Sequence, residues 1–188
     1  MVNEEYRLKK LARLVADRRA VLDLGCARIR NRHLSNARVV GLDLESFEPP
    51  ANYTESVVGD VTELPTPFEP MSFDAIIAGE LLEHLENPLA FLRGCCQTLA
   101  PGGILALSTP NPNSPFERVL TLTLSRRFFY TENHVLLFPQ RWLIRVLERC
   151  GFEDVHLYSG GFPIPGLGLV PFPRPWCYQT IATAIKPV

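Results

Sequence analysis

The sequence has almost no net charge, because 19 Lys and Arg residues stand against 20 Asp and Glu residues. A dedicated nucleic-acid-binding protein usually carries a strongly basic face, so no nucleic-acid partner is expected. No apolar run reaches the ~18 to 20 residues that span a bilayer, and the charged segment MVNEEYRLKK does not resemble a signal peptide. These absences predict a cytoplasmic protein without integral membrane association.

Cysteine is scarce, and its number is odd. Five cysteines are present, whereas a secreted disulfide framework normally shows an even number in a shorter chain. There is no C-x2-C motif, and the four histidines are far apart in the sequence, so no metal site is expected. We interpret the cysteines as reduced, mostly buried, small apolar residues.

Length and composition are those of one globular domain. The 188 residues are 46% apolar and 21% charged, and ~150 residues per domain is usual. We find no interdomain linker, and therefore interpret residues 1–188 as a single domain with an N-terminal helix within residues 1–19. Proline is abundant, at 17 residues, and clusters at 49–70 and 163–175.

Short apolar or β-branched runs alternate with helical patterns along the chain. Helices are predicted at 4–18, near 28–35, at 80–99 with a break at Asn87–Pro88, and at 139–150. Strands are predicted at 20–24, 38–43, 55–59, 73–78, 104–108, 153–158 and 179–185. This alternation is typical of an α/β fold, in which helical crossovers join the strands of a doubly wound, mostly parallel sheet.

Acidic residues and glycine follow the first predicted strands. The strand within VLDLGCAR (21–28) runs into a tight turn, where backbone N–H groups can meet a polar or anionic ligand group. Asp43 ends the second strand, and an acid at this place accepts hydrogen bonds from ribose hydroxyls in dinucleotide folds. The G-x-G-x-x-G fingerprint is absent, which disfavours a nicotinamide-dependent oxidoreductase.

Six motifs in this order resemble the class I S-adenosylmethionine-dependent methyltransferases, particularly those that act on small molecules. They are VLDLGCA (21–27), GLDLE (41–45), GDVTELP (59–65), SFDAIIAGELLEHLENP (72–88), LAPGGILALSTPN (99–111) and RWLIRVLERCGFEDV (141–155). The resemblance implies a Rossmann-like sheet of about seven strands, the last antiparallel. It also implies S-adenosylmethionine as cofactor, S-adenosylhomocysteine as product, and no metal.

The resemblance also implies a role for each residue that matches a family position. The amino-acid end of the cofactor would lie along Asp23, Gly25, Cys26 and Ala27. The ribose hydroxyls would bind Asp43, the adenine would lie near Leu44, Asp60 and Val61, and the sulfonium would lie near Ala78, Gly79 and Glu80. Asp43 and Asp60 could instead simply cap the turns that follow their strands.

The glycine loop departs from the family pattern. Ala27 and Ile29 stand where the family has its second and third glycines. If the loop kept the family's backbone, a side chain at positive φ would cost ~1–3 kcal/mol; a relaxed loop would avoid this cost and move its N–H groups. The segment 44–54 has no helical periodicity, so the helices on the cofactor side are expected to be trimmed.

Methyl transfer in this family resembles a direct displacement, which needs in-line placement and often a base. Glu80, His84 and His134 are the candidate catalytic residues. His84 follows Glu80 by four residues on a predicted helix, so the two side chains could share a face. Glu83 and His84 could instead be a structural pair. Arg28, Arg30, Arg32 and His33 form either a solvated basic helix face or a set of contacts to an anionic ligand.

Two long segments, 111–138 and 160–176, are expected to face the substrate or a partner, because long loops are usually functional or disordered. They are rich in apolar residues, which suits a groove for a ligand or a protein surface. The hypothesis is a small apolar or aromatic acceptor methylated at oxygen, and the alternative for these loops is a homodimer interface. A catalytically degenerate member of the fold, acting as a binding or regulatory subunit, is the second functional hypothesis.

Overall fold

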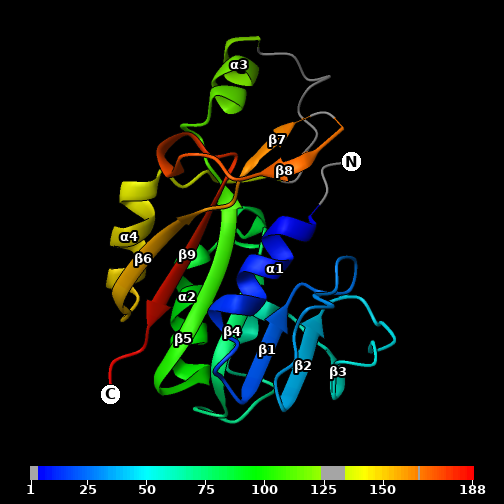
Figure 1. The fold of residues 1–188 in the computed structure, drawn as a ribbon. Coiled ribbons are helices and arrows are strands. Elements are labelled where there is room, and N and C mark those ends of the chain that lie inside the picture. Colours follow the sequence, from blue (N-terminus) through cyan, green and yellow to red (C-terminus); the bar gives the residue numbers. More distant parts are fainter. Residues whose placement is uncertain (1–3, 124–133, 165) are drawn as a thin grey trace.

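A seven-stranded sheet forms the centre of the protein (Figure 1). The computed structural model describes residues 4–123, 134–164 and 166–188. The strand order is β3-β2-β1-β4-β5-β9-β6. The strands are β1 (Ala20–Leu24), β2 (Arg38–Asp43), β3 (Glu55–Val58), β4 (Phe73–Gly79), β5 (Leu99–Pro110), β6 (Glu153–Ser159) and β9 (Gln179–Ile185).

The pairing confirms the predicted mostly parallel, Rossmann-like sheet. β1, β2, β3, β4 and β5 pair in parallel, whereas β9 pairs antiparallel with both β5 and β6. Each predicted strand is present, but β5 is much longer than the predicted 104–108, because it begins at Leu99 and ends at Pro110. Because the parallel strands all point the same way, the turns after β1, β2, β3 and β4 meet at one edge of the sheet (Figure 1).

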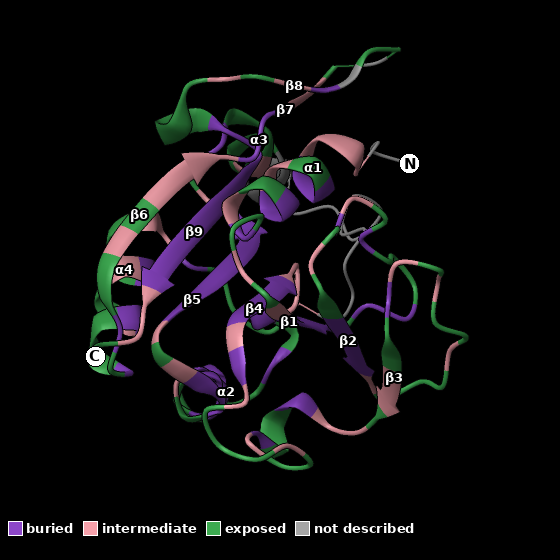
Figure 2. Ribbon diagram, turned by 60° about the horizontal axis from the view of Figure 1, so that its bottom comes forward, coloured by how far each residue is buried: buried purple, intermediate pink, exposed green. Residues whose placement is uncertain are grey.

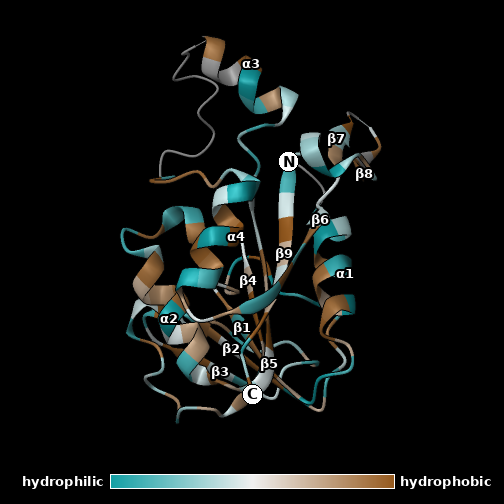
Figure 3. Cartoon of the chain, turned by 90° about the vertical axis from the view of Figure 1, so that its left-hand side faces the viewer, coloured by the Kyte–Doolittle hydropathy of each residue, from teal (hydrophilic) through white to brown (hydrophobic). Residues whose placement is uncertain are grey.

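The helices cover the two faces of the sheet unequally. One face packs against α1 (Glu5–Leu14), and the other against α2 (Pro88–Thr98) and α4 (Gln140–Arg149) (Figure 3). The alternation of side chains along a strand supplies both cores: in β4, Ala75 and Ile77 face α1, while Ile76 and Ala78 face the other helices.

The crossovers on the cofactor side lack helices, as expected for residues 44–54. The helix predicted near 28–35 is wrong, because these residues, all of them described, form turns and extended segments. In place of helices, Phe47 and Tyr53 from the second crossover and Leu34 from the first pack on this face of the sheet. Gly41 makes room for them, since a Cβ there would lie 2.6 Å from the Phe47 ring and 2.8 Å from Cys26 Sγ.

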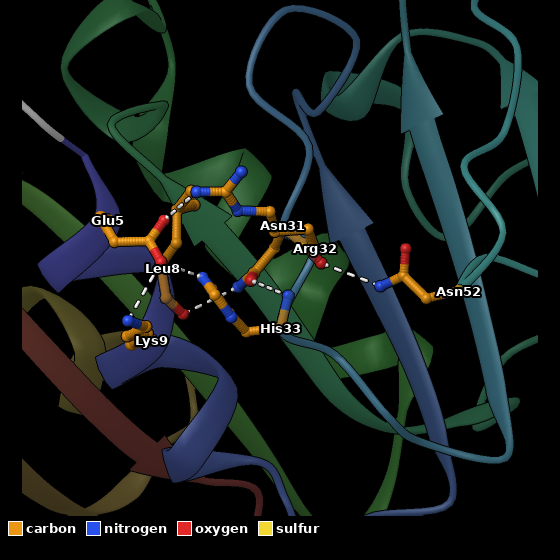
Figure 4. A network of polar contacts seen from close by, with 7 residues as sticks. All are labelled: Glu5, Leu8, Lys9, Asn31, Arg32, His33 and Asn52. Carbon is orange, nitrogen blue, oxygen red and sulfur yellow. Dashed lines mark hydrogen bonds and ion pairs between the residues drawn. The ribbon is translucent and has the colours of Figure 1, made fainter.

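Polar side chains fix the first crossover against α1 (Figure 4). The Asn31 side-chain amide donates to Leu8 O at 3.0 Å, and the Asn52 amide donates to Asn31 O at 3.1 Å. The Glu5 carboxylate pairs with Arg32 at 2.6 Å and with His33 at 2.9 Å. Arg32 and His33 therefore fasten the loop to the helix, and they are not the solvated helix face that was expected.

The predicted helix 80–99 begins later than expected. Glu80 has φ +53, in the left-handed region, so no helix can run through it. A short 3-10 turn, η2 (Leu82–His84), follows, and α2 starts at Pro88, where the Asn87 side chain accepts from Ala90 N–H at 3.1 Å. Glu80 and His84 therefore do not share a helix face.

The two insertions lie beyond the carboxyl ends of the strands (Figure 1). The first contains α3 (Pro115–Thr123), and the part of it at 124–133 lies outside the described residues. The second forms a hairpin of β7 (Phe162–Ile164) and β8 (Gly168–Val170), followed by the 3-10 turn η4 (Arg174–Trp176). The N-terminal helix is shorter than predicted, ending at Leu14.

The central strands of the sheet are more deeply buried than the edge strands (Figure 2). β5 and β9 are largely buried, while the edge strands β3 and β6 are half-buried or exposed. All five cysteines are free thiols, and all but Cys96 are buried, as predicted. Within the described ranges, no helix has the length and apolarity to cross a bilayer.

Candidate functional site

A cavity of about 680 Å³ opens where β1 and β4 end, next to α1. It gathers all three predicted catalytic residues and part of the predicted cofactor site. The predicted residues that line it are Asp23, Gly25, Cys26, Gly79, Glu80, His84 and His134. The described lining does not include Ala27, Asp43, Leu44, Asp60, Val61 or Ala78.

The turn after β1 follows the family pattern at Gly25 and departs from it at Ala27. Gly25 has φ +66, which favours glycine, and its N–H donates to Leu42 O at 2.9 Å. Among the described residues the non-glycine positions with positive φ are Met71, Glu80 and Asp154, so Ala27 carries no left-handed strain. The Ala27 N–H donates to Asp43 Oδ2 at 2.8 Å.

The acids after β2 and β3 both bind nearby backbone. Asp43 also accepts from Glu45 N–H at 2.9 Å, and Asp60 accepts from the Thr62 N–H and hydroxyl, both at 2.8 Å, at the start of the 3-10 turn η1 (Val61–Glu63). Each carboxylate oxygen can accept more than one hydrogen bond, so these contacts are compatible with a ribose or adenine contact. Leu44 lies 67% exposed beside them.

Asp23 is a buried acid at the wall of the cavity. The Tyr53 hydroxyl donates to its carboxylate, and the Asn31 N–H donates in turn to the Tyr53 oxygen at 3.0 Å. Burial raises the pKa of Asp23 to about 6, although the Tyr53 hydrogen bond and the Arg7 charge act in the opposite direction. The carboxylate form is therefore costly unless a cation lies nearby.

Glu80 is the second acid in the cavity wall. Its N–H donates to Ser108 O at 3.0 Å, which holds the left-handed turn against β5. Its Oε1 atom is buried and accepts no hydrogen bond from the described residues. Burial raises the pKa of Glu80, with Arg7 opposing the shift. A buried carboxyl without a donor is a group that favours a cationic or hydrogen-bonding ligand.

His84 and His134 contact each other at the cavity wall although they are far apart in the sequence. Their rings lie 4.6 Å apart, edge to face, and His134 Nε2 lies 3.8 Å from Glu83 Oε1. The Glu83 carbonyl accepts from Val135 N–H at 2.8 Å and Leu136 N–H at 3.2 Å, which fixes the His134 segment against η2. Burial and the His84 charge lower the pKa of His134 to about 4, so it is neutral at pH 7.

Sequence analysis missed Arg7, which is 3% exposed and lines the cavity from α1. Its guanidinium binds Glu4 at 2.6 Å and reaches Ser108 Oγ at 3.4 Å. A Cβ on Gly79 would lie 2.2 Å from Arg7 Nη1, so glycine is needed there for this approach. The signal was present in the helical pattern, because Arg7 precedes Leu11 and Val15 at four-residue spacing on the buried stripe.

Much of the remaining lining is apolar or aromatic, although Glu4, Arg28, Asn31 and Gln179 add polar groups to it. Leu8 and Leu11 come from α1, Ile29 from the glycine loop, and Phe116 from α3. Tyr178 lies opposite, and its ring is 5.6 Å from that of Phe116, edge to face. The first insertion therefore contributes Phe116 and His134 to the cavity, whereas no described residue of the second segment, 160–176, lines it.

These residues fit the cofactor that the family uses. The sulfonium and ammonium groups of S-adenosylmethionine are cationic, and the cavity offers the unpartnered Glu80 oxygen and the buried Asp23 carboxyl. Gly25 has no side chain, so the cavity wall stays open beside these two acids. Asp43, Leu44 and Asp60 lie at the ends of β2 and β3, where they would contact the adenosine end.

A family model described as a methyltransferase domain matches residues 3–157. The chain belongs to this family. The resemblance to class I S-adenosylmethionine-dependent methyltransferases is thereby confirmed. A methyltransferase from Archaeoglobus fulgidus, described as dependent on S-adenosylmethionine, shares the fold with a TM-score of 0.71 at 18% identity, over 98% of this chain and 95% of that one.

Two curated relatives are methyltransferases. A probable S-adenosylmethionine-dependent methyltransferase of Mycolicibacterium smegmatis is 29% identical over 143 residues, which are 72% of this chain and 52% of the relative. A ubiquinone biosynthesis O-methyltransferase of Xanthomonas campestris is 54% identical over 43 residues, 23% of this chain and 18% of the relative. The chain spans about half or less of these relatives.

Proposed function

We propose that this methyltransferase-family protein transfers the methyl group of S-adenosylmethionine to an oxygen of a small, apolar or aromatic acceptor. The observation that supports the proposal is one cavity whose lining combines acidic and imidazole groups with apolar and aromatic side chains. The acidic groups suit a cationic cofactor, and the apolar groups suit a ring or an alkyl group.

Cofactor binding would use the residues around β1 and β4. Bound S-adenosylmethionine supplies a methyl group on a sulfonium, and this sulfur is its leaving group. Asp23 and Glu80 would neutralise the cationic end, while Arg7 limits the negative charge that the two acids place in the cavity. Gly25 would let the ligand approach the backbone.

The acceptor would lie beside the contacting rings of Phe116 and Tyr178, with its hydroxyl toward the histidines. His134 is neutral at pH 7 and can accept a hydrogen bond from that hydroxyl, which orients its oxygen. Glu80 would take the proton as the oxygen–methyl bond forms, because its raised pKa makes it a stronger base than an exposed glutamate. Apolar walls exclude water that would otherwise solvate the nucleophile.

A second candidate function is a binding or regulatory subunit without turnover. It is favoured by the hydrogen bond from the Ala27 N–H to Asp43. This bond occupies both a loop N–H group that could bind the cofactor and the carboxylate that would accept from the ribose. A cofactor would have to share or break this contact, and its affinity would fall accordingly.

Calorimetric titration of the purified full chain with S-adenosylmethionine and S-adenosylhomocysteine, extended to millimolar concentration, separates the two functions. Micromolar binding is expected. A panel of phenols, catechols, amines and polar acceptors is then assayed by mass spectrometry for a methyl adduct. Methylation of only polar or macromolecular acceptors would contradict the acceptor class, and the absence of heat at millimolar ligand would leave the non-catalytic function.

The matched variants for the assay are Glu80→Gln and Glu148→Gln. Glu148 is exposed on α4, away from the cavity, and controls for loss of one carboxylate. E80Q is expected to lower turnover ~100-fold, the usual contribution of a general base, and also to weaken cofactor binding, because Glu80 faces the cationic end of the cofactor. Unchanged turnover in E80Q would show that Glu80 takes no part in the reaction.

A further inference from the structure

We propose that Glu83, His84 and His134 bind a divalent first-row transition-metal ion at the wall of the cavity. One ligand atom from each residue, a carboxylate oxygen and two imidazole nitrogens, lies within 4.8 Å of the other two. Nothing in the family match requires this ion, and the sequence predicted no metal because its histidines are widely spaced.

The distances are close to those of a coordination shell. Nitrogen and oxygen ligands lie ~2.0–2.2 Å from zinc, so the ligand atoms around one ion are at most ~4.4 Å apart. The separation of Glu83 Oε1 from His134 Nε2 is 3.8 Å, already within this limit. Every separation in the group is within 4.8 Å, at most a few tenths of an ångström beyond the limit, and a bound ion would draw the side chains inward.

Glu83 is the strongest argument for a bound cation. The residue is fully buried, and neither of its carboxylate oxygens accepts a hydrogen bond from the described residues. Buried carboxylates are almost always hydrogen-bonded, paired or coordinated to a metal. Glu80 carries another buried oxygen, Oε1, that accepts no hydrogen bond from the described residues. A divalent ion would add positive charge beside Glu83, next to that of Arg7 in the cavity wall.

The backbone holds the three ligands in place. Glu83 and His84 are neighbours on η2, and the Glu83 carbonyl accepts the N–H groups of Val135 and Leu136 at 2.8 and 3.2 Å. His134 directly precedes these two residues, so the same hydrogen bonds that join the segments bring its ring to His84. A site positioned by backbone contacts loses little entropy when the ion binds.

The ligand set selects the class of metal. Two imidazoles and one carboxylate suit zinc, iron, cobalt or manganese, whereas magnesium prefers oxygen ligands and retains its waters. Three protein ligands with a remaining open position are also the usual arrangement of a catalytic rather than a structural zinc site.

The open positions of the ion would face the cavity. His84 and His134 line the cavity, while Glu83 lies buried behind them. An ion held there would coordinate an oxygen of the acceptor and favour its deprotonated form, with Glu80 left as the nearby carboxyl. This extension rests on the proposed function, whereas the binding of the metal itself does not.

The test uses the full chain after treatment with a chelator and removal of that chelator. Cobalt(II) is titrated while the visible d–d absorption is followed, and zinc and magnesium are titrated calorimetrically. We expect one equivalent of cobalt and of zinc to bind, magnesium to bind far more weakly, and zinc to displace cobalt. Circular dichroism confirms that the treated chain remains folded.

The variants are His134→Ala and Glu83→Gln, with His156→Ala as the matched control. His156 is exposed on β6 and pairs with Asp154, outside the cavity. H134A and E83Q are expected to lose at least ~10-fold in zinc affinity, and H156A to bind as the wild type does. If E83Q does not fold, H134A alone decides, because His134 is partly exposed.

A folded chain that binds no cobalt would overturn the proposal, and so would cobalt binding unchanged in H134A. Glu83 and His134 would then form a contact between a buried carboxyl group and a neutral imidazole. These outcomes are independent of the titration with S-adenosylmethionine. Cofactor binding without metal would leave the methyltransferase function standing, and metal binding without cofactor would leave the metal site standing.

Discussion

The Ala27 backbone N–H donates to the Asp43 carboxylate at 2.8 Å, which joins the turn after β1 to the end of β2. This contact explains how a loop that has lost its second glycine keeps an unstrained backbone. A side chain at position 27 is tolerated because Ala27 is outside the left-handed region.

A glycine at position 27 should therefore not tighten cofactor binding. Ala27→Gly is expected to lower the free energy of unfolding by about 0.5–1 kcal/mol, since glycine gains more freedom in the unfolded chain. The affinity for S-adenosylmethionine should change by less than about threefold. Urea unfolding and calorimetry measure the two quantities. Cofactor binding ten times tighter in A27G would show that Ala27 strains the ligand-bound loop.

Asp23 should make stability fall as the pH rises through mildly acidic values. Its pKa is raised from 3.8 to about 6 in the folded chain, so between these values the folded state binds more protons than the unfolded state. The free energy of unfolding then decreases with pH, by on the order of 3 kcal/mol from this group. The Asp23→Asn variant should lack this contribution to the pH dependence of the unfolding free energy between pH 4 and 6.

The measurement is urea unfolding of wild type and D23N at several pH values. Glu80 and Glu83 also have raised pKa values and add slope of the same sign, so only the difference between the two curves reports on Asp23. Asp17→Asn, at an exposed carboxylate, is the control for removal of one charge. Parallel curves for wild type and D23N would contradict the prediction.

Gly79→Ala should destabilise the protein through Arg7. The added Cβ would lie 2.2 Å from Arg7 Nη1 and 3.6 Å from Leu11 Cδ1, so the guanidinium must leave its place beside Ser108. The expected loss is about 1–3 kcal/mol of unfolding free energy.

Two comparisons isolate the cause of the G79A effect. Gly59→Ala meets only a Leu42 methyl at 3.1 Å, so it should cost less. The double variant G79A/R7A should be more stable than the sum of the two single changes predicts, because removal of the guanidinium relieves the clash. Additive effects would mean that the alanine acts through another neighbour.

Glu5→Gln should loosen the first crossover. Hydrogen bonds from Arg32, His33 and Lys9 lower the pKa of Glu5 to about 2, so the pairing is present above about pH 4.5 and is lost as the pH falls toward 2. E5Q should speed amide exchange at residues 28–34 at neutral pH. Hydrogen–deuterium exchange measures this, and E148Q on α4 should leave the exchange of this segment unchanged.

The sheet could be predicted from sequence because each strand is a short apolar run with clear borders. Residues 20–24, 38–43 and 179–185 form β1, β2 and β9 with the predicted bounds. The expected helix at 28–35 was wrong. Asn31 holds this segment in place through hydrogen bonds with Leu8 and Asn52, which are distant in the sequence, and no local sequence pattern reveals such contacts.

The candidate site could be predicted only where it follows strand ends. Gly25 and Glu80 come directly after β1 and β4, so a motif locates them. The pairing of His84 with His134 depends on how the first insertion returns to η2, through hydrogen bonds to the Glu83 carbonyl, and sequence separation carries no sign of it.

The position of β9 between β5 and β6 has a consequence for folding. β6 has a single neighbour in the sheet, β9, which is formed by residues 179–185. During synthesis the edge of β6 therefore remains unpaired until β9 has emerged and inserted beside β5. The half of the sheet built from β1, β2 and β3 is joined by short crossovers and can form earlier, since short loops close at lower entropic cost. Nascent chains that stop before residue 179 should expose the edge of β5 to chaperones or to aggregation.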